Sequence, residues 1–273
     1  MTDRYAVIGN PITHSKSPQI HLGFAQATGQ DIDYTAIEGP LDGFEAAVRA
    51  FQLSGGRGMN VTAPFKLRAC ALADSRSARC ELAGAANALR IDGGRIDAEN
   101  FDGVGLVTDI QRNLGVSLRG KRVLILGAGG AVRGAMLPFL EQGPSLVAIA
   151  NRTVEKAERL ADEVRHRGTV AAGGYADVTR DRFDVVINAT SASLSGQLPP
   201  VSPEAFGRNT LAYELVYGKA MTPFLTLARN AGAGRLADGV GMLVEQAAEA
   251  FSWWRGVRPE THVQIKRLTV PLA

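Results

Sequence analysis

The chain has 273 residues, of which 45% are hydrophobic and 21% charged, and its formal net charge is +3. These values are typical of a soluble globular protein with one large domain or two ordinary ones, each with a buried core. Lysine and arginine are scattered, and no run interleaves basic with aromatic residues, so nucleic acid is not an expected partner.

Cysteine, histidine and apolar patterning exclude further classes. Cys70 and Cys80 are too few for a disulfide scaffold, and we expect both to be buried thiols. The four histidines form no metal-ligand spacing, so we expect no metal site and no zinc-dependent alcohol dehydrogenase. No apolar stretch approaches the roughly 18 residues of a membrane span, and residues 1–4 lead into a strand without a signal peptide. We therefore expect a cytoplasmic protein with no membrane partner.

Short strands alternate with helices in the first part of the chain, as in an α/β domain. Strands are expected at residues 5–9, 33–38, 58–61, 87–91 and 95–98. Helices are expected at residues 17–27, 41–53, 65–73 and 102–113. Pro18 stands at the favoured first position of its helix. Asp92, Gly93 and Gly94 are typical of a hairpin turn between the last two strands.

A second α/β unit begins at residue 121. Its strands are expected at residues 123–126, 146–150, 184–188 and 211–216, and a long amphipathic helix at residues 239–253. The first strand is followed directly by Gly127, Ala128, Gly129, Gly130 and Ala131. A strand, a glycine turn and a helix form the first βα unit of a dinucleotide-binding domain. Glycine allows the backbone to turn tightly and approach a pyrophosphate at the helix N-terminus.

The end of the second strand of this unit indicates which dinucleotide is bound. NAD enzymes usually carry Asp or Glu about 20 residues after the glycines. This chain has Asn151, Arg152 and Thr153 there, with Lys156 one helical turn further on. A carboxylate would repel a 2′-phosphate, whereas a guanidinium binds one bidentately. We therefore predict NADP as the cofactor; the alternative is that Arg152 is an ordinary solvated side chain.

Polar side chains of the first part collect where strands begin and end, the place where open α/β sheets bind ligands. They are Ser15, Ser17, Asn60, Thr62, Lys66, Asn87 and Asp102. Uncharged donors and acceptors predominate, with one lysine and one aspartate, which suits a small molecule that bears several hydroxyls. The ordinary alternatives are a solvated lysine and helix-capping residues.

The motifs that contain these residues resemble those of the shikimate dehydrogenase family. The sequences S-K-S-P, N-V-T-x-P-x-K, A-x-N, N-x-D-G, G-A-G-G-A, N-R-T and Q-A occur in that family's order, and the match extends from residue 9 to residue 247. The chain departs from the family pattern at Phe101, where most relatives have threonine, and at Lys156, where a second arginine is frequent. Lysine is a point charge and not a fork, so Lys156 bears on how strictly NADP is preferred.

The resemblance implies reversible, NADPH-dependent reduction of 3-dehydroshikimate to shikimate, in the pathway to chorismate and aromatic amino acids. It implies that Lys66 and Asp102 are the catalytic pair and that Ser15 and Ser17 bind the substrate carboxylate. The other implied substrate-binding residues are Asn60, Thr62, Asn87, Tyr217 and Gln246, with Asp102 also bound to a hydroxyl. The cofactor-binding residues are expected to be Gly127, Ala128, Gly129, Gly130, Ala131, Asn151, Arg152, Thr153, Lys156, Thr190 and Gly239.

The residue types fit this chemistry. Hydride arriving at a ketone carbon leaves charge on the oxygen, so a positioned proton donor lowers the barrier. The ammonium of Lys66 can polarise and protonate that oxygen, and a nearby Asp102 carboxylate would orient it. In the reverse direction the lysine accepts the proton of the alcohol.

We predict two α/β domains with an active-site cleft between them, the second a Rossmann-type doubly wound parallel sheet. Residues 1–104, completed by C-terminal helices in residues 238–273, would form the substrate-binding domain, and residues 105–237 the NADP-binding domain. A small-molecule substrate is the expected partner, and a monomer or homodimer the expected assembly. Two alternatives stay open: a quinate/shikimate or broader polyol dehydrogenase of the same family, and a dinucleotide-sensing protein without turnover. A sensor has no need of a proton-transfer pair.

Overall fold

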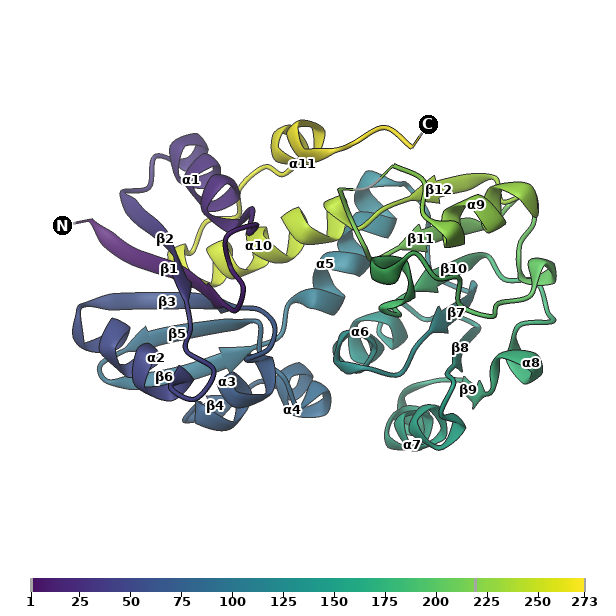
Figure 1. The fold of residues 1–273 in the computed structure, drawn as a ribbon, viewed down its shortest axis with the longest axis horizontal. Coiled ribbons are helices and arrows are strands. Elements are labelled where there is room, and N and C mark those ends of the chain that lie inside the picture. Colours follow the sequence, from purple (N-terminus) through teal and green to yellow (C-terminus); the bar gives the residue numbers. More distant parts are fainter. Residues whose placement is uncertain (1, 219, 273) are drawn as a thin grey trace. The chain divides into compact units, whose positions relative to one another are not determined.

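The computed structural model describes residues 2–218 and 220–272 and divides the chain into two compact units (Figure 1). The first unit consists of Met1–Gly105 and Val244–Gln264, and the second of Leu106–Leu243 and Ile265–Ala273. The first boundary lies one residue after the predicted one. Residues 238–243 and 265–273, which were predicted to complete the first domain, belong to the second unit.

The first unit is built on a six-stranded mixed sheet with the strand order β2-β1-β3-β5-β6-β4. The strands are β1 (Asp3–Gly9), β2 (Ile32–Glu38), β3 (Gly56–Val61), β4 (Ser75–Arg76), β5 (Ala88–Asp92) and β6 (Arg95–Glu99). β1 is parallel to β2 and β3, and β5 is antiparallel to β3 and β6. The predicted hairpin turn is confirmed: Gly93 and Gly94 join β5 to β6 with φ of 54° and 88°, which glycine adopts without strain.

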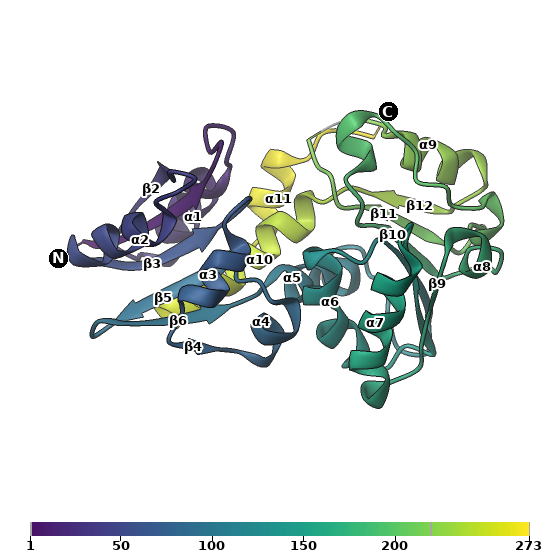
Figure 2. The ribbon, with the colours of Figure 1, turned by 60° about the horizontal axis from the view of Figure 1, so that its bottom comes forward.

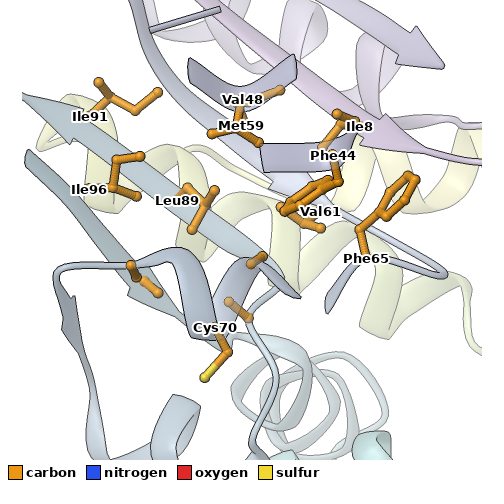
Figure 3. Packing of buried hydrophobic residues seen from close by; sticks show 14 of the residues in the cluster. Ile8, Phe44, Val48, Met59, Val61, Phe65, Cys70, Leu89, Ile91 and Ile96 are labelled. Atoms are coloured by element: carbon orange, nitrogen blue, oxygen red, sulfur yellow. The ribbon is translucent and has the colours of Figure 1, made fainter. Parts of the chain in front are cut away.

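Helices pack on both faces of this sheet (Figure 2). They are α1 (Ser17–Thr28), α2 (Phe44–Leu53), α3 (Lys66–Leu72), α4 (Ala78–Ala83) and most of α10 (Val240–Arg255). Because side chains alternate along a strand, β1 contributes to two cores. Ile8 packs with Phe44 and Phe65 in the core of Figure 3, whereas Tyr5 on the opposite face packs against Trp254 of α10.

The second unit contains a six-stranded sheet with the order β12-β11-β10-β7-β8-β9, and every pairing in it is parallel. Its strands are β7 (Arg122–Leu126), β8 (Leu146–Ala150), β9 (Val170–Gly173), β10 (Val185–Asn188), β11 (Leu211–Glu214) and β12 (Arg235–Ala237). From β7 the chain adds β8 and β9 toward one edge of the sheet. It then returns to the other side of β7 and adds β10, β11 and β12 there. This is the doubly wound order of a Rossmann-type fold, and the predicted fold class is confirmed.

The helices of the second unit are α6 (Gly130–Leu140), α7 (Val154–Val164), α8 (Tyr175–Val178) and α9 (Pro223–Asn230), and α11 (His262–Leu268) begins in the first unit and ends in the second. Short 3-10 turns occupy Arg165–Arg167, Ala192–Ser195 and Pro203–Ala205. The strands β7, β8 and β10 are almost entirely buried, as expected of parallel strands covered on both faces. No helix in the described part of the chain is long and apolar enough to cross a membrane.

The helix predicted at residues 102–113 differs in its second half. The α-helix α5 (Asp102–Thr108) gives way to a π-helical turn, Asp109–Asn113, in which the Leu114 N–H donates to the Asp109 carbonyl oxygen at 3.0 Å. The Asp109 carboxylate is buried and accepts hydrogen bonds from the Tyr213 hydroxyl at 2.7 Å and from Asn113 Nδ2 at 2.8 Å. The wider turn thus accompanies a buried contact with β11, which a local sequence pattern does not reveal.

A cluster of aromatic rings fills the α1 side of the first sheet. Its centre is His21 of α1, which is fully buried and stacks on Tyr34 with 4.3 Å between ring centroids and 5° between planes. Phe24, Phe251 and Trp254 surround the same imidazole. Among the described residues, neither ring nitrogen of His21 has a hydrogen-bond partner. Burial lowers the pKa of His21 from 6.5 to about 3, and the nearby Asn60 side chain opposes this only in part.

This burial makes stability depend on pH. In the unfolded chain the imidazole titrates at 6.5, but in the folded chain at about 3, so as pH falls the unfolded state binds the proton first. The stability contribution is complete above pH 6.5 and is lost as pH decreases, by about 1.4 kcal/mol for each pH unit. We expect His21→Phe to remove this loss. Between pH 7.5 and pH 5, the free energy of unfolding of the wild-type protein should fall by about 2 kcal/mol more than that of His21→Phe.

Urea denaturation at both pH values measures the difference. At pH 7.5 the imidazole is neutral in both states, so the comparison there isolates the cost of packing a phenyl ring. Parallel stability curves for the two proteins would contradict the prediction.

Candidate active site

Strand directions bring several loops of the first unit to one edge of its sheet. The parallel strands β1 and β3 both end at this edge, β5 runs antiparallel to β3 and begins there, and β6 ends there. Ser15 follows β1, Thr62 follows β3, Asn87 precedes β5 and Asp102 follows β6. The topology therefore gathers the polar residues predicted from strand ends, at the edge where α/β sheets bind ligands.

Lys66 and Asp102 form an ion pair at this edge. Lys66 Nζ donates to Asp102 Oδ2 at 2.7 Å, and the two side chains are 33% and 11% exposed. Asn87 Nδ2 donates to the other carboxylate oxygen, Oδ1, at 2.8 Å, and to Gln246 Oε1 of α10 at 3.1 Å. Four predicted site residues are thus in one hydrogen-bonded group, in which Asn87 and Gln246 are 159 positions apart in the chain.

The orientation of the Asn87 amide follows from its surroundings. Its oxygen accepts the backbone N–H of Phe101 at 2.9 Å. Because that N–H can only donate, the amide oxygen faces it, and the nitrogen is left to donate to Asp102 and Gln246. Asn87 is buried, so reversal of the amide would leave unmatched polar groups away from water. The position of the Asp102 carboxylate is therefore supported from its side opposite Lys66.

Asn60 joins the same group through the Asn87 carbonyl, and it brings in Tyr34, a residue that was not predicted from the sequence. The hydroxyl of Tyr34, in β2, donates to Asn60 Oδ1 at 2.6 Å, and Asn60 Nδ2 donates to the Asn87 carbonyl oxygen at 3.3 Å. A tyrosine within a half-buried strand has the sequence signature of a core residue. No local signal distinguishes it from one, because its partner lies 26 positions away.

Ser15, Ser17 and Thr62 lie at the start of α1 and after β3. Ser15 Oγ accepts the backbone N–H of Ser17 at 3.3 Å, and Ser17 is buried while Ser15 is half-buried. The Thr62 N–H donates to the Ile8 carbonyl oxygen at 3.0 Å. A Cβ on Gly9 would lie 2.5 Å from the Thr62 methyl group, so Gly9 is needed for the close approach of the two loops.

In the second unit, the glycine loop lies between β7 and α6 as predicted. Gly127 has a φ of +114°, a conformation that favours glycine. Gly129 precedes the first residue of α6, Gly130, without a side-chain cap, and Ala128 and Ala131 are half-exposed beside them. A Cβ on Gly129 or Gly130 would meet no protein atom within 4 Å. The loop therefore leaves space and free backbone N–H groups at a helix N-terminus, which fits a pyrophosphate.

The turn after β8 presents positive charge without a carboxylate. Asn151 Nδ2 donates to the Thr153 carbonyl oxygen at 2.8 Å and so holds the turn together. Arg152 and Lys156 are exposed, and neither forms an ion pair within the described residues. The charge of Arg152 reaches the Tyr175 hydroxyl, where burial raises the pKa and Arg152 partly opposes the rise. These residues fit a 2′-phosphate better than a ribose hydroxyl.

A buried carboxylate organises the loops that follow β10 and β11. Glu214 Oε2 accepts from Asn188 Nδ2 and Thr222 Oγ1, each at 3.0 Å, and also from the Ser193 hydroxyl. Asn188 Oδ1 accepts the N–H of Thr190 at 3.1 Å and its hydroxyl at 2.7 Å. Thr190, a predicted cofactor residue, is thus connected to Glu214 through Asn188. The sequence analysis did not identify Glu214.

Tyr217 and Gly239, two further predicted residues, lie in or beside the loop that follows β11. Tyr217 is 41% exposed. A Cβ on Gly239 would lie 2.1 Å from the Leu215 carbonyl oxygen, so this position requires glycine. Both residues belong to the second unit, together with the glycine loop and Arg152, whereas the Lys66 group belongs to the first.

The described residues contain no group of three or more His, Cys, Asp or Glu side chains that could hold a metal ion. A lysine–aspartate ion pair that could transfer a proton, and a glycine loop at a helix N-terminus of a doubly wound sheet, are features typical of dehydrogenases that use a dinucleotide.

Comparison with known proteins agrees with this class. Residues 7–89 match the family model described as the shikimate dehydrogenase substrate binding domain, residues 109–195 the shikimate / quinate 5-dehydrogenase model, and residues 239–268 the shikimate 5'-dehydrogenase C-terminal domain. The shikimate dehydrogenase (NADP(+)) of Nitrosospira multiformis is 53% identical over 268 residues, which cover 98% of each chain.

Two solved structures have the same fold over the whole chain. The crystal structure of an Ael1 enzyme from Pseudomonas putida has 61% identity and a TM-score of 0.96, with 100% of both chains covered. Shikimate 5-dehydrogenase from Thermus thermophilus, in complex with NADP(H) and shikimate, has 30% identity and a TM-score of 0.85, with 97% of this chain and 98% of that chain covered. The chain belongs to the shikimate dehydrogenase family.

The Glu214 contacts yield a stability prediction. In Glu214→Gln, an amide NH₂ replaces one carboxylate oxygen and faces the Asn188 amide nitrogen and the Val216 N–H, both of which only donate. We expect the free energy of unfolding to fall by about 1–3 kcal/mol, the usual cost of leaving a buried polar group unmatched.

Chemical denaturation measures this change, and Glu204→Gln, at an exposed position of the same unit, is the matched control. Equal stability of the two variants would show that the buried hydrogen bonds of Glu214 contribute nothing measurable.

Proposed function

We propose that the chain catalyses the reversible, NADPH-dependent reduction of 3-dehydroshikimate to shikimate, on the route to chorismate and the aromatic amino acids. The observation that carries this proposal is the 2.7 Å contact of Lys66 Nζ with Asp102 Oδ2, at a sheet edge where Asn87 and Gln246 converge. The relatives support the substrate and the cofactor: one is a shikimate dehydrogenase (NADP(+)), and another was solved with NADP(H) and shikimate.

In this proposal the first unit supplies the substrate-binding residues except Tyr217, and the second unit binds NADP. Ser15 and Ser17, at the N-terminus of α1, would bind the substrate carboxylate, where hydroxyls, backbone N–H groups and the helix dipole all favour an anion. Six residues would bind the substrate hydroxyls or line the pocket around them: Asn60, Thr62, Asn87, Asp102, Tyr217 and Gln246. Neutral donors and acceptors of this kind distinguish hydroxyl positions by geometry.

The second unit would hold the cofactor through the glycine loop and the turn after β8. Bound NADPH supplies the hydride. Gly127, Ala128, Gly129, Gly130 and Ala131 would accommodate the pyrophosphate, and Asn151, Arg152, Thr153 and Lys156 the adenosine 2′-phosphate. Thr190 and Gly239 lie on further loops of the same unit and complete the proposed cofactor contacts.

Lys66 performs the proton step in this scheme. Its ammonium donates a hydrogen bond to the ketone oxygen, and transfers a proton to that oxygen as negative charge develops there. Asp102 holds the ammonium in place, and Asn87 holds Asp102. In the direction of shikimate oxidation, neutral Lys66 takes the proton of the alcohol. The pair contacts the reacting oxygen directly, whereas the carboxylate and the other hydroxyls are bound elsewhere.

We also infer a cytoplasmic location and a monomeric or homodimeric assembly. A biosynthetic step that consumes NADPH takes place where reduced cofactor and pathway intermediates are supplied. This supports a cytoplasmic location of the protein. Light scattering on the purified protein distinguishes the two assemblies.

The function is tested by initial rates of oxidation of shikimate and of quinate, each with NADP⁺ and with NAD⁺. We expect the highest kcat/KM for shikimate with NADP⁺. A preference for quinate would favour a quinate/shikimate or polyol dehydrogenase, and absence of turnover with every pair would favour a dinucleotide-sensing protein.

Lys66→Met tests the proton step. It retains the apolar stem but removes the donor, so kcat should fall by at least the ~10²–10⁴-fold typical of a lost general acid–base group, with a much smaller change in the KM for shikimate. Asp102→Asn should also lower kcat and weaken substrate binding more. The double variant should be scarcely worse than Lys66→Met, because the two side chains act as a unit.

Lys266→Met, at an exposed lysine of α11, is the control. A Lys66→Met enzyme with a tenth of wild-type kcat would return Lys66 to a structural role.

Arg152→Ala tests the cofactor assignment. Loss of a charge-assisted hydrogen bond should raise the KM for NADP⁺ roughly 10- to 150-fold and leave that for NAD⁺ nearly unchanged. Lys156→Ala should act in the same direction but more weakly, and Arg159→Ala, an exposed arginine of the same helix, should have little effect. An equal loss of affinity for both cofactors would disprove contact with the 2′-phosphate.

A further inference from the structure

The orientation of the Asn60 side chain is determined by two neighbours. Its nitrogen lies 3.3 Å from the Asn87 carbonyl oxygen, and its oxygen lies 2.6 Å from the Tyr34 hydroxyl. The Asn87 carbonyl can only accept, so the amide nitrogen must face it, and the hydroxyl of Tyr34 must donate to the amide oxygen. Without Tyr34 the amide oxygen of this buried side chain would lose its donor within the described structure.

Tyr34 is itself held as a donor. Its ring stacks on His21 at 4.3 Å, which fixes the plane of the phenol. Burial raises the pKa of Tyr34 well above its ordinary value, and a hydrogen bond with Ser17 only partly offsets this. The phenol therefore keeps its proton. His21, whose ring nitrogens have no hydrogen-bond partner in the described part of the chain, adds no charge at neutral pH because burial lowers its pKa to about 3.

These contacts place Tyr34 between two groups of proposed substrate-binding residues. On one side is Ser17, a proposed ligand of the carboxylate, and on the other is Asn60, a proposed ligand of a hydroxyl. Beyond Asn60, the Asn87 carbonyl leads to the side chain that supports Asp102. Tyr34 thus contacts binding residues on both sides but is two residues removed from the proton-transfer pair.

We propose that Tyr34 is a positioning residue that fixes Asn60 with its amide nitrogen available to a substrate oxygen, so that this position selects a hydrogen-bond acceptor. The inference rests on the proposed function, because it assigns to Tyr34 a role in binding the same substrate. An Asn60 amide fixed in this way offers its remaining N–H to a hydroxyl or carbonyl oxygen. It favours such a group over an ammonium, which can only donate.

The kinetic test is Tyr34→Phe, which removes a single oxygen and keeps the ring. We expect the KM for shikimate to rise about 3- to 10-fold, the range for loss of one neutral hydrogen bond, while kcat and the KM for NADP⁺ change less than about twofold. In an Asn60→Ala background the same change should add less than about twofold, because Tyr34 acts through Asn60. Tyr5→Phe is the matched control: Tyr5 lies on the same face of the sheet and stacks on Trp254 at 4.9 Å.

A structural role alone would lower stability without this split between KM and kcat and without dependence on Asn60. An unchanged KM in Tyr34→Phe, or an equal effect with and without Asn60, overturns the inference and leaves the proposed function intact. A wild-type protein that does not turn over shikimate overturns the proposed function and the inference together.

A second measurement uses the wild-type protein and does not depend on the folding of Tyr34→Phe. In protein labelled with ¹⁵N-asparagine, the side-chain NH₂ signal of Asn60 is assigned by its loss in Asn60→Ala. Addition of shikimate should shift one of its two proton resonances more than the other, because one N–H is already bound to the Asn87 carbonyl. If neither resonance moves at saturating shikimate, Asn60 does not donate to the substrate and the inference is wrong.

Discussion

The candidate site of the first unit depends on Asn87, whose side chain and carbonyl oxygen both form hydrogen bonds within it. The Phe101 N–H determines the direction of its amide, the amide nitrogen then supports Asp102 and Gln246, and its carbonyl oxygen accepts from Asn60. Because each of these contacts has one allowed direction, the Phe101 N–H determines the orientation of the Asn87 amide, and the Asn87 carbonyl oxygen determines that of the Asn60 amide. A rigid first contact of this kind allows the carboxylate of Asp102 to hold a lysine in one place, and general acid catalysis needs such positioning.

In the second unit, too, one buried side chain connects several loops by hydrogen bonds, and here it is the carboxylate of Glu214. Glu214 is fully buried, and its carboxylate is matched by the side chains of Asn188, Ser193 and Thr222 without a cationic partner among the described residues. An anion away from water requires such compensation. The consequence is that loops after two different strands are fixed to one carboxylate, and Thr190 is fixed with them through Asn188. Loops that carry binding residues are thereby attached to the sheet.

Sequence patterns predicted the structural features that depend on residues close together in the chain. Most of the predicted strands and helices, the turn at Gly93 and the glycine loop before α6 follow from local periodicity and from the backbone freedom of glycine, and the structure confirms them. The ordered motifs predicted a role for Lys66 and Asp102, which the structure brings to 2.7 Å. The catalytic role itself stays a prediction.

What could not be predicted depends on distant pairs. Tyr34 contacts Asn60 from 26 positions away, and Asp109 contacts Tyr213 from 104 positions away. Their sequence surroundings are those of an ordinary strand and an ordinary helix, and only the fold makes partners of them. The π-helical turn at Asp109 and the fixed amide of Asn60 are both consequences of such pairs, so periodicity alone cannot indicate either one.

In the proposed function, substrate binding and proton transfer depend on groups of different charge. Lys66 and Asp102 carry charge, whereas Tyr34, His21 and Asn60 are neutral, the first two because burial moves their pKa values away from neutrality. A neutral hydrogen bond acts only over its own length, while an ion pair in a partly buried place acts over several ångströms. Loss of the Tyr34 hydroxyl therefore changes the orientation of one amide but leaves the field at the lysine almost unaltered. If Lys66 and Asp102 transfer the proton as proposed, we expect substrate selectivity to vary through such neutral neighbours while this pair is retained.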